Sequence, residues 1–137
     1  MLPTPCLCTK LRRATRSVSK LYDDALIAVG LNVAQYSLLK NLQRLNRPSI
    51  TDLAEAVGLE RSTLGRNLQV LEAKGLIVLA DGEDQRNRLV CLTTAGQGCL
   101  AQALQAWEQA QEQLSQRIGA QQKVALMALL DDLQTLD

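Results

Sequence analysis

Apolar residues recur at alternating spacings of four and three along the N-terminal part of the chain. The positions of this seam are Leu7, Leu11, Ala14, Val18, Leu21, Ala25 and Ala28. Such a heptad pattern predicts one helix over about residues 6–29, which Gly30 ends. The stripe covers either the chain's own core or a partner helix, within the chain or across a dimer, and both interpretations stay open. Five basic residues lie off the seam, either as a solvated face or within reach of phosphates: Lys10, Arg12, Arg13, Arg16 and Lys20.

Three shorter amphipathic segments follow, each bounded by a capping residue, a proline or a glycine. Asn32 is placed to cap a second helix that stops near Pro48, and Ser49 begins a third, short helix that Gly58 ends. A fourth helix follows at once and ends at Gly75. Its buried face is predicted to carry Leu64, Leu68 and Leu71. Two short helices joined by a glycine-containing turn form the helix-turn-helix pattern.

The fourth helix has a polar side suited to reading nucleic acid. Ser62, Arg66 and Gln69 point away from its leucine face, and the flanks carry Arg61, Thr63 and Asn67. Arginine, serine, threonine and asparagine donate hydrogen bonds to base edges and phosphates, as a recognition helix requires. Taken alone, the same pattern also fits an ordinary solvated helix.

The next segment predicts a two-stranded hairpin. Residues 76–79 and 89–92 are strand-like, and the polar, turn-rich stretch 80–88 separates them. A helix-turn-helix followed by a hairpin is a winged helix. Its wing would carry Arg86 and Arg88 towards a minor groove or the DNA backbone, where the negative potential favours arginine.

The C-terminal part repeats the four-three rhythm of the first helix. Thr93 or Thr94 caps a long helix that Gly119 breaks, and a final helix is predicted over about residues 120–136. The apolar positions are Leu100, Leu104, Trp107, Leu114, Ile118, Leu126, Leu130 and Leu133, and Gln111 fills the one missing seam position. These helices are acidic and rich in glutamine, so we expect them to serve association rather than DNA binding.

Charge is distributed unevenly along the chain. The 137 residues include 15 basic and 14 acidic side chains, a net charge of +1. Residues 1–88 carry 13 basic and 9 acidic residues, whereas residues 89–137 carry 2 and 5. Because a local basic surface matters more for DNA binding than the total, the first part is the candidate DNA-binding portion.

The absence of histidine excludes several kinds of chemistry. It removes Ser-His-Asp and Cys-His nucleophile pairs within one chain, and it removes HExxH and Cys-His zinc sites. The chain has no glycine-rich phosphate loop, and its paired aspartates at 23–24 and 131–132 are typical of solvated helix positions. We therefore expect no enzyme activity, and we assign no cofactor and no metal site.

Length and hydropathy predict a single globular domain in the cytoplasm. A chain of this size with 47% hydrophobic residues buries a substantial core. No apolar run approaches the roughly 20 residues of a membrane-spanning helix. The N-terminus lacks the basic segment and apolar core of a secretory signal. We expect no membrane partner.

At this point the chain resembles the MarR family, the multiple-antibiotic-resistance-type regulators of bacteria. The resemblance extends over nearly the whole chain and is most specific in residues 49–96. Within that run, LxxxGLI from Leu71 to Ile77 matches the family's exit from the recognition helix, and DxRxxxxxLT from Asp84 to Thr93 matches its wing. A bare helix-turn-helix is a weak signal, but the same unit with this wing and flanking heptad helices is a specific one.

The resemblance implies a mostly α fold in one domain, residues 1–137. A winged helix-turn-helix unit at residues 31–93 would lie between dimerisation helices at 1–30 and 94–137, which form the base of a homodimer. The implied function is that of a transcriptional regulator, a repressor, that binds a pseudo-palindromic operator in double-stranded DNA. Its half-sites would lie about one helical turn, roughly 34–36 Å, apart.

The resemblance also assigns DNA-contacting residues. Ser62, Thr63 and Arg66 match the family's major-groove residues, Arg86 matches the wing-tip arginine, and Asp84 is expected to brace the wing. The chemistry of the side chains adds Arg61, Asn67 and Arg88.

Two residues depart from the family's pattern. Glu60 stands where many relatives have serine or aspartate as the helix cap; glutamate suits the helix dipole but caps less well. Gly65 lies inside the recognition helix, where glycine costs about 1 kcal/mol relative to alanine. Either that helix starts loosely or its backbone comes unusually close to a neighbour.

Regulators of this kind release DNA when an effector changes the spacing of the two recognition helices. Cys6 and Cys8 stand at the start of the first helix, where the helix N-terminus and nearby basic residues favour a reactive thiolate. Family members that sense organic hydroperoxides carry a reactive cysteine at this place, and some resolve it with a cysteine from the C-terminal helices of the other subunit. The resemblance therefore implies redox sensing by Cys6 or Cys8, with Cys99 of the other subunit as the resolving residue. Two alternatives remain, soft-metal binding by the CxC pair and cysteines that are merely small residues in a reducing compartment. Cys91 is expected to face outward and receives no role.

Two further functional hypotheses remain. A small amphipathic or phenolic effector would bind in the cleft between the dimer base and the winged helix, although only three aromatic residues are present to stack on it. The protein would otherwise be a helical adaptor or antirepressor that does not bind DNA. That alternative predicts loss of the basic groups, yet all four arginines of the recognition helix and wing are present: Arg61, Arg66, Arg86 and Arg88.

Overall fold

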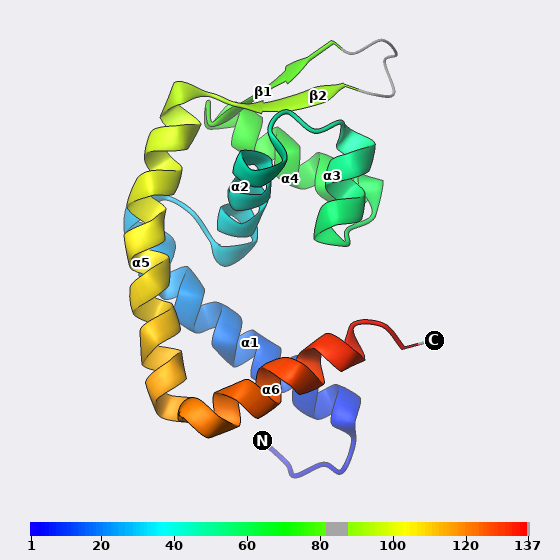
Figure 1. Ribbon diagram of the computed structural model, residues 1–137, viewed down its shortest axis with the longest axis vertical. Helices are drawn as coiled ribbons and strands as arrows, with labels where there is room; N and C mark the ends of the chain where they lie inside the picture. The colour runs from blue at the N-terminus through cyan, green and yellow to red at the C-terminus, as the bar shows by residue number, and fades with distance from the viewer. Residues whose placement is uncertain (82–87, 137) are drawn as a thin grey trace.

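A computed structural model describes residues 1–81 and 88–136, in which one small hairpin projects from the end of a helical molecule (Figure 1). The helices are α1 (Leu7–Leu26), α2 (Val33–Leu45), α3 (Ile50–Val57), α4 (Arg61–Ala73), α5 (Thr94–Ile118) and α6 (Ala120–Leu133). The short 3-10 helix η1 (Ile27–Val29) follows α1, and the antiparallel strands are β1 (Ile77–Ala80) and β2 (Leu89–Leu92). The mostly helical class with a two-stranded wing is as predicted.

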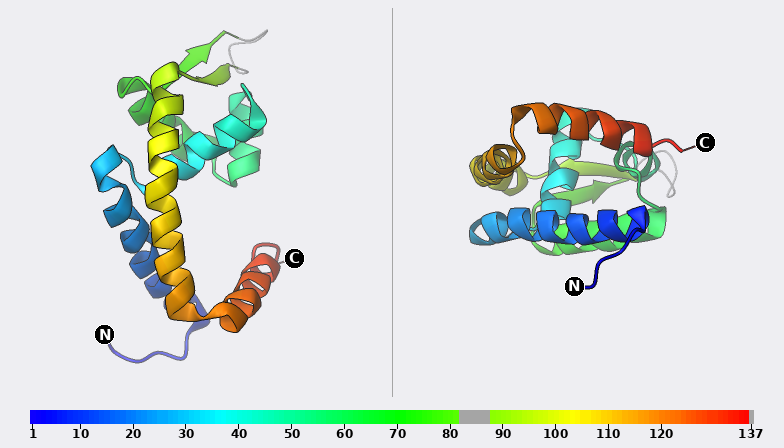
Figure 2. Two further views of the ribbon diagram at one scale, coloured as in Figure 1. Left: turned by 60° about the vertical axis from the view of Figure 1, so that its left-hand side comes forward. Right: turned by 90° about the horizontal axis from the view of Figure 1, so that it is seen from below.

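The long helix α5 is the spine of the molecule. It runs from the hairpin at one end to α6 at the other, and α1 packs along it (Figures 1 and 2). Helices α2, α3 and α4 gather beside the first turns of α5 and the hairpin. A winged helix-turn-helix unit therefore lies between long terminal helices. Within the described ranges, none of the helices combines the length and apolar character needed to cross a membrane.

Side-chain caps begin three of the helices, as the sequence predicts. The Asn32 side chain accepts the backbone N–H of Gln35 at 2.8 Å, and the Gln35 side chain accepts that of Asn32 at 3.1 Å. Ser49 accepts the N–H of Asp52 at 3.0 Å. Thr93, rather than Thr94, caps α5 by accepting the N–H of Gly96 at 2.9 Å. Each bond satisfies a donor that the first helical turn leaves without a partner.

Three element boundaries differ from the predictions, one of them in the final helix, which ends at Leu133 rather than at about residue 136. The first strand begins at Ile77 rather than at Leu76, because the backbone of Leu76 is used elsewhere. Its N–H donates to Leu71 at the end of α4, and its carbonyl accepts the N–H of Thr93. The α-helix of α1 ends at Leu26, after which the chain tightens into η1, and Gly30 ends it in the left-handed conformation, φ 76°.

The core lies in the winged-helix unit and reaches into α1 and α5. Its fully buried side chains are Leu26, Leu39, Leu53, Leu64, Leu68, Leu71, Ile77 and Val90. The three predicted leucines of the fourth helix are among them. The predicted seam position Gln111 accepts a hydrogen bond from the Tyr22 hydroxyl, so a polar pair closes the contact between α1 and α5.

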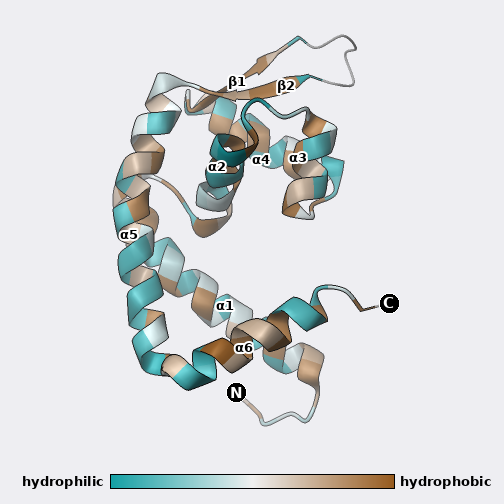
Figure 3. Ribbon diagram, viewed as in Figure 1, coloured by the Kyte–Doolittle hydropathy of each residue, from teal (hydrophilic) through white to brown (hydrophobic). Residues whose placement is uncertain are grey.

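The surface formed by the start of α1 and by α6 is not covered by other parts of the same chain. The N-terminal half of the α1 seam is exposed, with Leu7 at 76%, and α6 exposes apolar side chains such as Val124 and Leu129 (Figure 3). The buried residues of α1 are Tyr22 and Leu26, which lie off the predicted seam. The seam residues Leu21 and Ala25 are half-buried and line a groove against α5. The seam therefore adds no residue to the core cluster, and its N-terminal half is left open.

Candidate nucleic-acid interface

The turn between α3 and α4 sets the recognition helix on the core. Gly58 adopts φ 69°, a left-handed conformation that glycine accepts without strain, and its N–H returns to the end of α3. Leu53 of α3 and Leu64 of α4 are both fully buried in one core cluster, and the two helices pack against each other. This contact turns the opposite side of α4 outward.

The outward side of α4 carries the residues predicted to contact DNA. Arg61, Ser62 and Arg66 are exposed, whereas Thr63 and Asn67 are half-buried on the flank. Arg66 forms no ion pair with a residue of the described ranges. Glu60 is the N-cap residue and makes no side-chain capping bond, as its chemistry predicts. The first turn of α4 therefore presents its backbone N–H groups and positive helix end beside these donors.

The wing begins next to this helix. Arg88 is half-buried, and its Nε is shielded from solvent with no hydrogen-bond partner among the described residues. Asp84 and Arg86, the predicted tip residues, lie outside the described residues. The described part of the hairpin therefore contains Arg88 of the residues predicted to contact DNA.

Backbone hydrogen bonds tie the base of the wing to the α2–α3 connection. The N–H of Ile50 donates to the Arg88 carbonyl at 3.1 Å, and the N–H of Val90 donates to the Pro48 carbonyl at 2.8 Å. Ser49 and Leu89 form an antiparallel bridge between these bonds. The wing and the helix-turn-helix are therefore held in one frame.

A second feature is a cavity of about 370 Å³ between α2 and α5. One hypothesis from the sequence places an effector cleft between the dimer base and the winged helix, but it does not predict the aromatic cluster found here. The Tyr36 and Trp107 rings stack there with centroids 5.9 Å apart, and the Tyr22 ring is tilted against the Trp107 ring with centroids 6.4 Å apart. Lys40 and Arg44 of α2 complete the lining. Three aromatic residues scattered through the sequence gave no signal of this cluster, because their convergence depends on how α1, α2 and α5 pack.

The predicted reactive cysteines lie at the exposed start of α1. Hydrogen bonds from the side chain and then the backbone of Thr9 lower the pKa of the Cys6 thiol. Cys8 is also exposed and lines an apolar groove of about 890 Å³ between α1 and α6, together with Leu11 and Leu133. Both thiols are exposed in the single chain.

Cys99 lies in a different environment. It is half-buried near the start of α5, with its Sγ 3.6 Å from the Val29 carbonyl, and burial raises the pKa of its thiol. In one chain it stands at the opposite end of α5 from the start of α1, so the fold does not bring it to Cys6 or Cys8 (Figure 1). Cys91, expected to face outward, is half-buried.

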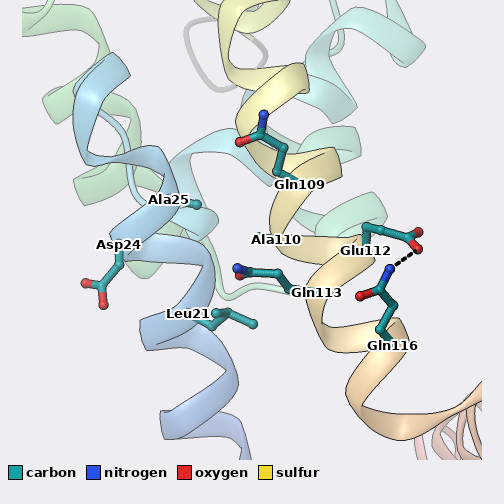
Figure 4. A pocket seen from close by; sticks show the side chains of 8 residues that line it. All are labelled: Leu21, Asp24, Ala25, Gln109, Ala110, Glu112, Gln113 and Gln116. Atoms are coloured by element: carbon teal, nitrogen blue, oxygen red, sulfur yellow. Dashed lines mark hydrogen bonds between the residues drawn. The ribbon is translucent and has the colours of Figure 1, made fainter.

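A groove between α1 and α5 is lined by both polar and apolar side chains (Figure 4). Gln113 points from α5 towards Leu21 of α1, and Gln116 donates to Glu112 at 3.1 Å. The residues lining this groove of about 610 Å³ are Leu21, Asp24, Ala25, Gln109, Ala110, Glu112, Gln113 and Gln116. They include no cation, so this groove is not suited to binding phosphate.

Comparison with known proteins shows which family and which proteins this chain is similar to. The family model of the MarR family matches residues 29–87. The HTH-type transcriptional regulator YwoH of Bacillus subtilis (strain 168) is 28% identical over 87 residues, which cover 64% of this chain and 64% of that protein.

Solved structures extend the likeness to the whole chain. The M. tuberculosis transcriptional regulator MosR in complex with DNA is 30% identical, with a TM-score of 0.79 over 96% of this chain and 99% of that one. The transcriptional repressor CouR bound to a 23-mer DNA duplex is 26% identical, with a TM-score of 0.87 over 98% and 99%. The winged helix, the long terminal helices and these matches agree, and the chain belongs to the MarR family of transcriptional regulators.

Proposed function

We propose that this protein is a homodimeric repressor that binds a pseudo-palindromic operator through α4 and the wing, and that an effector releases it. The exposed donor face of α4, held over a buried leucine row, is the observation that carries the proposal. The relatives MosR and CouR, each solved with DNA, support the same partner here. Asp84 and Arg86 at the wing tip, with Arg88 at its base, supply the second contact in this proposal.

The operator is the first thing to identify. Wild-type protein selects duplexes from a random-sequence library, and we expect an enriched pseudo-palindrome. Fluorescence anisotropy with that duplex then measures affinity as a function of salt. A phosphate-contacting protein loses affinity linearly in log–log form, with a slope of about −0.9 for each phosphate neutralised. A flat salt dependence with no enriched sequence favours the helical adaptor instead.

Two arginine variants separate base reading from phosphate binding. Arg66→Ala should weaken operator binding by roughly 5- to 100-fold and relax sequence preference, as loss of a base contact does. Arg86→Ala should weaken binding to all duplexes and reduce the salt slope by about 1. Arg117→Ala, which removes the same charge at the far end of α5, is the matched control. Wild-type affinity in both test variants would show that the site is misassigned.

The uncovered apolar surface supports the homodimer. Monomeric proteins rarely expose contiguous apolar patches of this kind. Here the start of α1 and both sides of α6 are apolar and exposed, and the groove between them is lined by Leu7, Leu11, Leu133 and Leu136. A second copy offers the same surface in return, so a two-fold contact covers both.

Oxidation at the start of α1 is the proposed release signal. The Cys6 thiolate attacks the terminal oxygen of an organic hydroperoxide and the O–O bond breaks, giving Cys6 sulfenic acid and an alkoxide that takes a proton from solvent to leave as the alcohol. A second thiol, from Cys8 or from the partner's Cys99, then condenses with the sulfenic acid to form a disulfide and water. Because Cys8 lines the α1–α6 groove, this change takes place at the proposed dimer contact.

The redox proposal has a direct test. Stoichiometric cumene hydroperoxide should lower the operator affinity of the wild type and of Cys91→Ser, but not of Cys6→Ser. Mass spectrometry of the oxidised protein identifies the resolving thiol. Unchanged affinity in fully oxidised wild type would remove cysteine oxidation as the signal.

The cavity between α2 and α5 favours a second kind of effector, a small amphipathic phenolic anion. Stacked Tyr36 and Trp107 rings suit an aromatic face, and Lys40 and Arg44 suit a carboxylate. Trp107 is the one tryptophan of the chain, so its fluorescence reports binding directly. We expect 4-hydroxybenzoate to quench it more strongly than phenol, and Arg44→Ala to remove the difference. Equal quenching by both compounds would count against an anion site.

A further inference from the structure

Gly65 is a residue whose presence the chain itself does not explain. It lies inside α4 with ordinary helical backbone, because the glycines with positive φ are Gly30, Gly58, Gly75 and Gly119. A Cβ atom built on Gly65 meets nothing within 4 Å. Neither conformation nor packing therefore requires glycine here, although alanine would favour the helix.

Gly96 shows what an internal requirement looks like in the same fold. A Cβ atom there would stand 2.1 Å from the Leu76 carbonyl oxygen. At Gly65 no such neighbour exists among the described residues. The missing side chain therefore leaves space on the outer surface of α4.

That space borders the face proposed to bind DNA. On a helix surface, residues three and four apart are neighbours. Gly65 is half-buried at the edge of that face: the exposed residues Arg61, Ser62 and Gln69 lie on one side of it, and the buried Leu68 lies on the other. The helix has a second destabilising feature, because its N-cap residue Glu60 makes no side-chain capping hydrogen bond. An intrinsically weakened helix start coincides with the surface that meets the operator.

The dimensions of the DNA major groove explain why a missing side chain on α4 would matter. The major groove is about 12 Å wide, and an α-helix with its side chains is about 10–12 Å across. The flanks of a recognition helix therefore approach the groove walls closely, and a flank without a side chain comes closer still. Resting on the proposed DNA binding, we infer that Gly65 is a positioning residue: its bare backbone lets α4 lie against one wall of the major groove, setting the depth of Arg66 and Ser62.

The experiment compares stability with affinity. The probe is the labelled duplex that the wild-type protein enriches from a random library, measured by anisotropy at one fixed salt concentration. Gly65→Ala should raise the melting temperature by about 3 °C, because alanine favours the helix. It should weaken binding to the duplex by about fivefold or more, because a methyl group enters a close contact. Gly65→Ser should weaken it further.

Gly98→Ala is the matched control. Gly98 lies on α5, is exposed, and a Cβ atom built on it also meets nothing within 4 Å. This variant should gain stability in the same way and keep wild-type affinity. If Gly65→Ala binds as tightly as the wild type, or more tightly because the helix is better ordered, the inference is overturned. If the wild type enriches no duplex, the proposed function fails instead.

Discussion

Replacement of Gly96 by alanine tests the joint between the recognition helix and the spine. The new Cβ atom would lie 2.1 Å from the Leu76 oxygen, 3.1 Å from the Leu76 carbonyl carbon and 3.2 Å from Cδ2 of Leu92. The Leu76 carbonyl cannot turn away, because it accepts the N–H of Thr93 at 3.1 Å. The first turn of α5 must therefore move away from the exit of α4.

The expected cost follows from two opposing effects. Overpacking a close contact costs about 1–3 kcal/mol, and a backbone neighbour places this case at the upper end. Alanine returns about 1 kcal/mol through its helix preference. The net loss of unfolding free energy is about 2 kcal/mol, which for a chain of this size lowers the melting temperature by roughly 6–8 °C.

Thermal unfolding followed by far-UV circular dichroism measures this loss. All variants are compared at one protein concentration, because the melting temperature of a dimer depends on concentration. Gly98→Ala, two residues further along α5 and free of close neighbours, should melt at or above the wild type. If Gly96→Ala had the same melting temperature as Gly98→Ala, the proposed contact between α5 and Leu76 would be refuted.

Three further predictions concern the caps, the thiols and the base. Ser49→Ala removes the cap of α3 and should lower the unfolding free energy in urea by about 1 kcal/mol without changing the slope of the urea dependence. Hydrogen bonds from Thr9 lower the pKa of Cys6 while burial raises that of Cys99, so the rate of iodoacetamide alkylation should level off at a lower pH for Cys6 than for Cys99. Mass spectrometry measures both pH profiles, and Thr9→Val should shift the Cys6 profile to higher pH. Coincident Cys6 and Cys99 profiles would contradict this prediction. Leu129→Glu places a charge on the exposed apolar side of α6 and should give monomers in light scattering, whereas persistent dimers would place the contact elsewhere.

Features set by neighbours along the chain could be predicted from the sequence. Asn32, Ser49 and Thr93 cap helices by bonding to residues three positions away, so a short segment contains both partners. The Leu64, Leu68 and Leu71 face likewise depends only on helical periodicity. The predicted DNA-contacting side of α4 follows as the opposite face, and Asp84 and Arg86 stay predictions because they lie outside the described residues.

Features that join distant segments were decided by the tertiary structure alone. The cluster of Tyr22, Trp107 and Tyr36 exists because α1, α2 and α5 meet, and nothing local to any of these residues encodes it. The contact between Gly96 and Leu76, and the separation of Cys99 from Cys6, likewise depend on where whole helices lie. Hydrogen bonds within a turn depend on a few backbone angles, whereas these contacts depend on the packing of complete elements, which periodicity does not specify.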